Sequence, residues 1–167
     1  SSDAIHITNT AASSSIISIN NTRIIGNASS SMLLALPAGP EKRIENSFFN
    51  STDAGWVLNG RRLKVFNSQI YAVDTAINCG RGCTLRNVTV NTTSGSAINQ
   101  NDDGTSNFLN SIIVGASYGV RNGWVSNNLI TNIRNTTLHG AIKYQIHGGD
   151  GASDGTYTIN ITNSSLD

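Results

Sequence analysis

A six-residue pattern recurs along this chain and limits the fold more than any other feature. The pattern reads apolar, any, Asn, any, any, apolar, and its first copy covers residues 19–24. Successive copies lie 20 to 28 residues apart. A repeat of this length is typical of folds built from stacked units. The Asn residues of the seven copies are Asn21, Asn46, Asn67, Asn87, Asn110, Asn135 and Asn163.

A second column of residues repeats with the same period. It consists of a small residue followed by an apolar one, as in Ala76-Ile77 and Ala97-Ile98. Two interleaved columns that share a period of about 22 residues are not expected by chance. The apolar members are Met32, Trp56, Ile77, Ile98, Val120 and Ile142.

The repeats favour short strands over helices. They are rich in Ile, Val and Thr and are interrupted by Asn and Gly, which disfavours helix. About 22 residues hold two or three short strands with their turns. Coils of this kind stack in parallel, so each backbone pairs with the coils above and below while apolar side chains stack inside. The sequence therefore predicts an all-β parallel β-solenoid of about seven coils.

The coil pattern and its Asn-rich turns resemble those of the pectin-lyase-like superfamily of right-handed parallel β-helices. That family includes bacteriophage tailspikes and bacterial surface proteins. The resemblance covers residues 16–166 and concerns architecture, because no catalytic signature of the family is present. It implies a right-handed helix, in agreement with the general hand of parallel crossovers.

We expect a single domain, residues 1–167, with residues 1–15 as a partial coil or cap. Two excursions from the coils are expected at residues 36–43 and 145–158. The repeated Asn residues have a structural explanation, because Asn tolerates left-handed backbone geometry at bends. Stacked Asn amides also form hydrogen-bonded ladders.

Charge argues against several classes of partner. The chain carries 11 Lys and Arg against 10 Asp and Glu, a net charge of +1. This balance supplies no basic field for nucleic acid. The longest apolar run has five residues, far too short for membrane insertion.

Two carboxylates occupy the same place in neighbouring repeats. Asp53 and Asp74 each follow a repeated Asn by seven residues. Because stacked strands lie about 4.8 Å apart, the pair could serve as the acid and base of a glycosidase or lyase. Alternatively, it could bind Ca²⁺ or simply form turns, since Asp is common in turns. Basic residues that could accept a proton lie nearby in sequence: Arg61, Arg62 and Lys64.

Other side chains offer further candidates. Cys79 and Cys83, separated by two glycines and an arginine, fit either a small disulfide loop or two free thiols. A metal site would need further ligands that the sequence does not place, so no metal or cofactor is expected beyond the possible Ca²⁺. Tyr118, Trp124 and Tyr144 are candidates for stacking on sugar rings.

These observations favour a structural function. A short solenoid has two open strand edges, which invite pairing with other chains unless they are capped. We therefore expect a self-associating module, a homotrimer or a filament, of an extracellular fibre, cell surface or virion appendage, with possible contact to surface polysaccharide. The alternative is a polysaccharide-degrading or carbohydrate-binding domain, with Asp53 and Asp74 as the catalytic pair if it is an enzyme.

Overall fold

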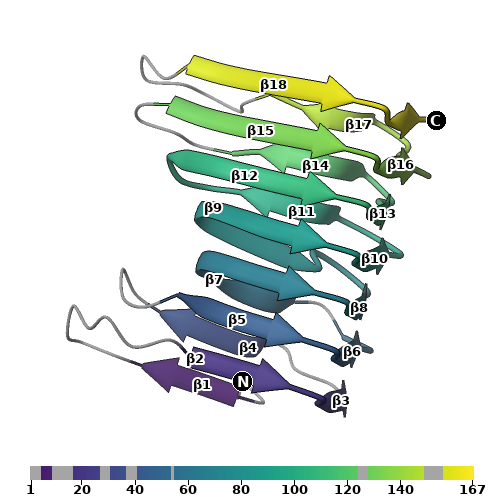
Figure 1. Ribbon diagram of the computed structural model, residues 1–167. Coiled ribbons are helices and arrows are strands. Elements are labelled where there is room, and N and C mark those ends of the chain that lie inside the picture. Colours follow the sequence, from purple (N-terminus) through teal and green to yellow (C-terminus); the bar gives the residue numbers. More distant parts are fainter. Residues whose placement is uncertain are drawn as a thin grey trace.

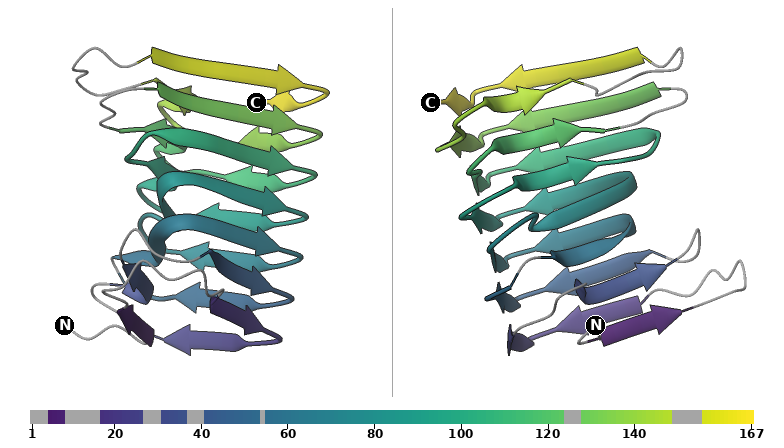
Figure 2. Two further views of the ribbon diagram at one scale, coloured as in Figure 1. Left: turned by 60° about the vertical axis from the view of Figure 1, so that its left-hand side comes forward. Right: turned by 180° about the vertical axis from the view of Figure 1, so that it is seen from behind.

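The computed structural model describes residues 5–8, 17–26, 31–36, 41–53, 55–123, 128–148 and 156–167. Every regular element in these ranges is a β-strand, and every strand pair is parallel. The strands stack as a β-solenoid in which the chain climbs coil by coil (Figure 1). Near strands run rightwards in both Figure 1 and the view from behind in Figure 2, so the solenoid is right-handed.

The solenoid has three faces, and the first two belong to one 12-stranded sheet. β7 (Trp56–Phe66) and β9 (Ile77–Arg86) bend from the first face to the second and so join them. The other strands of the first face are β1 (Ile5–Thr8), β4 (Ser31–Leu36), β11 (Ser96–Gln100), β14 (Tyr118–Asn122) and β17 (Tyr144–His147). Those of the second face are β2 (Ile17–Asn20), β5 (Lys42–Glu45), β12 (Gly104–Leu109), β15 (Asn128–Arg134) and β18 (Thr156–Thr162).

The third face is a separate seven-stranded sheet. It contains β3 (Arg23–Gly26), β6 (Phe48–Ser51), β8 (Gln69–Ala72), β10 (Thr89–Thr92), β13 (Ile112–Val114), β16 (Thr137–His139) and β19 (Ser165–Leu166).

The solenoid comprises about five turns, slightly fewer than the seven coils predicted. The predicted excursions are also shorter, because β5 begins at Lys42, β17 extends to His147 and β18 begins at Thr156.

Columns of inward-facing apolar residues form the core. One column runs along the second face through Ile44, Val65, Leu85, Phe108 and Ile133, each at most 1% exposed. Burial of such side chains contributes about 1.5–3 kcal/mol each. The apolar residues at every second position of a strand therefore determine which side of that strand faces the core.

The predicted apolar column is correct in the middle coils and wrong in the outer ones. Ile77, Ile98 and Val120 face inward and are fully buried. Trp56 and Ile142 are 38% and 87% exposed. The register places Leu58 and Ile146 in the column instead, because the outer coils differ in length from the 22-residue mean.

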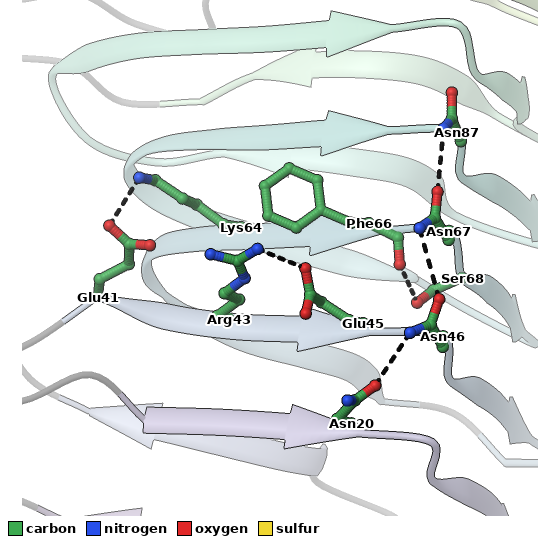
Figure 3. Close-up of polar contacts among 10 residues, drawn as sticks. All are labelled: Asn20, Glu41, Arg43, Glu45, Asn46, Lys64, Phe66, Asn67, Ser68 and Asn87. Carbon is green, nitrogen blue, oxygen red and sulfur yellow. Dashed lines mark hydrogen bonds and ion pairs between the residues drawn. The ribbon is translucent and has the colours of Figure 1, made fainter.

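A left-handed Asn ends the second face in every coil. The seven repeated Asn residues have φ between 48° and 56°, a region that most side chains avoid. Amides of the middle turns form a ladder (Figure 3): Asn67 Nδ2 donates to Asn46 Oδ1 at 3.4 Å, and Asn87 Nδ2 donates to Asn67 Oδ1 at 2.9 Å. Below them, Asn46 Nδ2 donates to Oδ1 of Asn20 rather than of Asn21, at 3.1 Å. The predicted Asn ladder is thus present, and two shorter ladders join Asn59 to Asn78 and Asn107 to Asn132.

A hydroxyl column runs beside this ladder. The residue after the left-handed Asn is Ser or Thr in most coils, and its hydroxyl donates to the carbonyl two residues earlier, as Ser68 does to Phe66 at 2.7 Å. The same oxygen accepts the backbone N–H of the coil below, as from Ser47 at 3.1 Å. Each coil therefore fixes the turn of its neighbour.

We expect Asn67→Ala to destabilise the protein more than Asn67→Gly. Alanine loses the amide bonds and also bears the left-handed strain of about 1–2 kcal/mol, whereas glycine loses only the bonds, each worth about 1 kcal/mol. Urea unfolding monitored by circular dichroism measures both. Equal losses, or a larger loss for glycine, would show that the left-handed turn is not the constraint.

A lysine occupies an inward position of the second face. Lys42 lies in register with Ile17 below and Leu63 above, and it is only 3% exposed. Burial lowers the pKa of its ammonium below the usual 10.5, and Arg62 and Arg61 lower it further. Between this lowered pKa and 10.5 the unfolded chain binds more protons than the folded one, so Lys42 makes stability rise with pH.

We expect Lys42→Met to stabilise the protein by about 1 kcal/mol or more at neutral pH, because replacement of a buried charge by an apolar group is often favourable. The advantage over the parent should shrink as the pH approaches 10.5. Thermal melts at several pH values measure it, with the outward-facing Lys64→Met as the control. A gap independent of pH would refute the assignment.

Candidate functional site

An aromatic cluster lies on the first face, on β14 and β17. Tyr118 and Tyr144 occupy paired positions of adjacent strands, and their rings stack with centroids 6.3 Å apart and planes 22° apart. The His147 ring lies 5.2 Å from Tyr118 and 5.3 Å from Tyr144. Tyr144 is 57% exposed, so the cluster is open to solvent.

Two cations border the cluster. The Arg121 guanidinium lies 5.5 Å and the Lys143 ammonium 5.4 Å from the centroid of the Tyr118 ring, within the range of cation–π attraction. The arrangement offers apolar ring surface together with hydrogen-bond donors. Sequence analysis proposed Tyr118 and Tyr144 as sugar-stacking residues, and the structure brings them together; Trp124, the third, lies outside the described residues.

A charged cluster occupies the bend between the first and second faces. The carboxylate of Asp102 contacts the guanidinium groups of Arg61 at 3.1 Å and Arg81 at 3.5 Å, so it joins three successive coils. The bend is made possible by left-handed Arg62 and Arg81 and by a shift of register between Arg61 and Leu63. Such partly exposed ion pairs contribute little stability each, about 0–1 kcal/mol.

Two cavities lie on the second face, one at this bend and one at the opposite end of the strands, beside the Asn turns. One of about 310 Å³ is lined by Arg62, Lys64 and Thr84 among others, and the Lys64 ammonium contacts Glu41 at 2.6 Å (Figure 3). A second of about 340 Å³ is lined in part by Phe66 and Arg86.

An ion pair borders the second cavity. Glu45 accepts a hydrogen bond from Arg43 at 2.7 Å, and this bond raises the pKa of Arg43. The Arg43 guanidinium also lies 5.2 Å from the centroid of the Phe66 ring. This outward side of the second face is therefore polar and cationic.

The carboxylates proposed as a catalytic pair lie at the corner between the third and first faces. Asn50 pairs with Tyr71, which places Asp53 and Asp74 at equivalent positions of neighbouring coils. The close approach of Asp74 to Gly95 of the next coil leaves no room there for a side chain, since a Cβ on Gly95 would lie 2.1 Å from Asp74 Oδ1.

The basic residues proposed to assist that pair lie elsewhere. Arg61 and Arg62 lie at the opposite end of the first-face part of β7, and Lys64 lies beyond the bend. Five strand residues separate the two corners, about 16 Å. Arg61 and Lys64 contact Asp102 and Glu41 instead. The structure therefore separates the two carboxylates from the basic residues that were proposed to accept a proton.

The two cysteines form a disulfide inside the solenoid. Cys79 and Cys83 are 1% and 2% exposed, and the bond closes the bend of β9. This is the first of the two alternatives left by the sequence. Among the described residues, no group of three or more His, Cys, Asp or Glu side chains could hold a metal ion.

The upper coils have a polar interior that was not predicted from the sequence. Gln100 Nε2 donates to Asn122 Oδ1 at 2.8 Å and to Thr131 Oγ1 at 2.9 Å, and all three residues are at most 1% exposed. Ser106 is also fully buried and accepts the backbone N–H of Cys83 at 3.1 Å. The sequence does indicate this polar interior, because these polar residues occupy repeat positions that are apolar in other coils.

In the described part of the chain, no helix is long and apolar enough to cross a membrane. Comparison of the chain with protein-family models, with curated proteins and with solved structures found no match.

Proposed function

We propose that the chain is a structural, self-associating β-solenoid module of an extracellular fibre or virion appendage of the tailspike type. The observation that carries the proposal is the apolar surface at the upper end. Ile161 and Leu166 are 43% and 45% exposed, whereas Ile133 and Leu138, the residues below them in the same columns, are at most 1% exposed. Side chains in inward, core positions are thus exposed at the upper end of the axis.

In the described part of the chain, the usual protection of a sheet edge is not found on the strands at this end. Natural sheets blunt their edges with charges, prolines or covering segments. β18 and β19 contain neither a charged residue nor a proline. Among the described residues, no strand pairs with the upper side of β17, β18 or β19. An edge of this kind supports association through further strands.

The interior disulfide supports an extracellular location. Disulfides form and persist in oxidising compartments and are rare in the cytosol. The two cysteines of the chain are both used in this bond.

We expect the purified chain to form assemblies that Ile161→Lys disrupts, because a charge in the exposed column cannot be buried against a partner. Light scattering with negative-stain imaging gives the assembly state. The matched control is Ile112→Lys, at a similarly exposed residue on the outer side of the middle coils. Thermal melts of both variants check the fold. A parent chain that stays monomeric at all concentrations would overturn the proposal.

Carbohydrate binding is a second candidate function, favoured by the stacked rings of Tyr118 and Tyr144. Exposed tyrosines present a flat apolar surface with a polar hydroxyl, which suits a sugar ring. We expect soluble polysaccharides in a screening panel to bind the parent, and Tyr144→Ala to weaken that binding at least tenfold. Isothermal titration measures it, with Tyr71→Ala, on the third face, as the control. Equal affinities of the two variants would exclude this surface.

A further inference from the structure

We infer that a second copy of this chain stacks head to tail on the first, with its N-terminal coil placed directly on the C-terminal coil in the solenoid register. The inference rests on the proposed self-association and specifies its geometry. The two end coils carry the same turn with the same spacing. The upper one contains Ile159, Ile161, Asn163 and Leu166, and the lower one contains Ile17, Ile19, Asn21 and Ile24.

These residues already belong to the same columns. Ile19 pairs with Ile44, and the column continues through the intervening coils to Ile161. On the third face, Ile24 and Leu166 likewise begin and end one column. A second copy placed one coil higher therefore sets Ile19 over Ile161 and Ile24 over Leu166. The aliphatic column then continues from one copy into the next.

The backbone hydrogen bonds between successive coils have a fixed direction, and a head-to-tail contact between two copies preserves it. In each turn the left-handed Asn donates its N–H upward, as Asn135 does to the Thr162 carbonyl at 3.1 Å. The residue two positions later donates downward, as Ser165 does to the Thr136 carbonyl at 3.1 Å.

The upper end therefore presents the N–H of Asn163 and the carbonyl of Ser164. The lower end presents the groups that match them. By equivalence with Glu45 and Phe48, these are the carbonyl of Asn20 and the N–H of Arg23.

The side-chain ladders have the same polarity. An upper Asn donates its amide to the oxygen of the Asn below, so Asn163 Oδ1 is positioned to accept from a coil above it. A hydroxyl accepts the backbone N–H of the coil below, so Ser164 N–H requires a hydroxyl above it. Thr22 of the second copy supplies one, and its hydroxyl is already oriented by donation to the Asn20 carbonyl at 3.0 Å.

This match is specific to one orientation. Two upper ends would meet with their strands antiparallel, so the parallel pairing and the Asn turns would not continue across the contact. A contact between unlike ends is heterologous, and along a straight axis it repeats without closing. The expected assembly is therefore a filament in which the solenoid continues through successive copies.

Cross-linking tests the register. Ser18 and Asn160 are exposed, outward residues that begin and end one column of the second face, so in the stacked pair they face each other across one coil spacing. That spacing of about 4.8 Å lies within disulfide range. We mix Ser18→Cys with Asn160→Cys, oxidise the mixture and identify the products by non-reducing electrophoresis and mass spectrometry.

We expect the 18–160 heterodimer to exceed both homodimers at least fivefold, and the double variant to give a ladder of multimers. The matched control replaces Asn160→Cys with Thr162→Cys, two residues out of register, and should give several-fold less heterodimer. A second in-register pair, Asn20→Cys with Thr162→Cys, repeats the test if one variant fails to assemble by light scattering.

The outcomes separate this inference from the function on which it rests. Assemblies that yield mainly 18–18 or 160–160 products, or equal yields in and out of register, would overturn head-to-tail stacking and leave self-association standing. A chain that forms no assemblies would overturn both.

Discussion

The structure depends on hydrogen bonds between the backbones of successive coils, and these bonds require that every coil turn at the same place. The left-handed Asn at the end of the second face meets that requirement. It supplies the backbone conformation, and its amide joins the turns above and below. The neighbouring hydroxyl satisfies a backbone N–H that the turn would otherwise leave without a partner. The same Asn and hydroxyl residues therefore stabilise both the local turn and the stacking of coils that are distant in sequence.

Coils of unequal length fit together because their variation is confined to other corners. The turns between the second and third faces superpose in register from Asn21 to Asn163, although the Asn spacing ranges from 20 to 28 residues. The difference is absorbed in part at the bend between the first two faces, where β7 and β9 are continuous but later coils are interrupted. The charged cluster around Asp102 lies at that bend, and so do several residues that line the cavity of about 310 Å³. Charged and polar side chains are therefore found at the corner where the backbone path differs between coils.

The sequence predicts the features that demand a particular residue type. A left-handed turn favours Asn or Gly, so the seven turns could be located from the repeated Asn residues, and the parallel solenoid followed from them. The apolar column could be placed only where the coil length matches the mean, at Ile77, Ile98 and Val120. In the outer coils, Leu58 and Ile146 occupy the column positions predicted for Trp56 and Ile142, because the unequal coil lengths move the register by two and four residues.

The candidate site was predictable only in part for a related reason. The stacking of Tyr118 on Tyr144 follows from the repeat, since equivalent positions in adjacent coils are neighbours in space. The separation of Asp53 and Asp74 from the arginines of β7 does not, because it depends on which corner each segment occupies. Lys42 is also unpredictable from composition, since its inward position is set by strand alternation alone.

Association along the axis and binding on the side of the solenoid are compatible, because they use different atoms. The proposed axial contact would use inward side chains and the backbone edges of the end coils. Tyr118 and Tyr144 point outward from the first face. In a filament of stacked copies the tyrosine pair would recur once per copy, about 34 Å apart for seven coil spacings. A weak contact to one sugar would thus become a multivalent contact to a polymer, since each further site binds at a high effective concentration. A rigid solenoid favours this gain because it fixes the spacing of the sites.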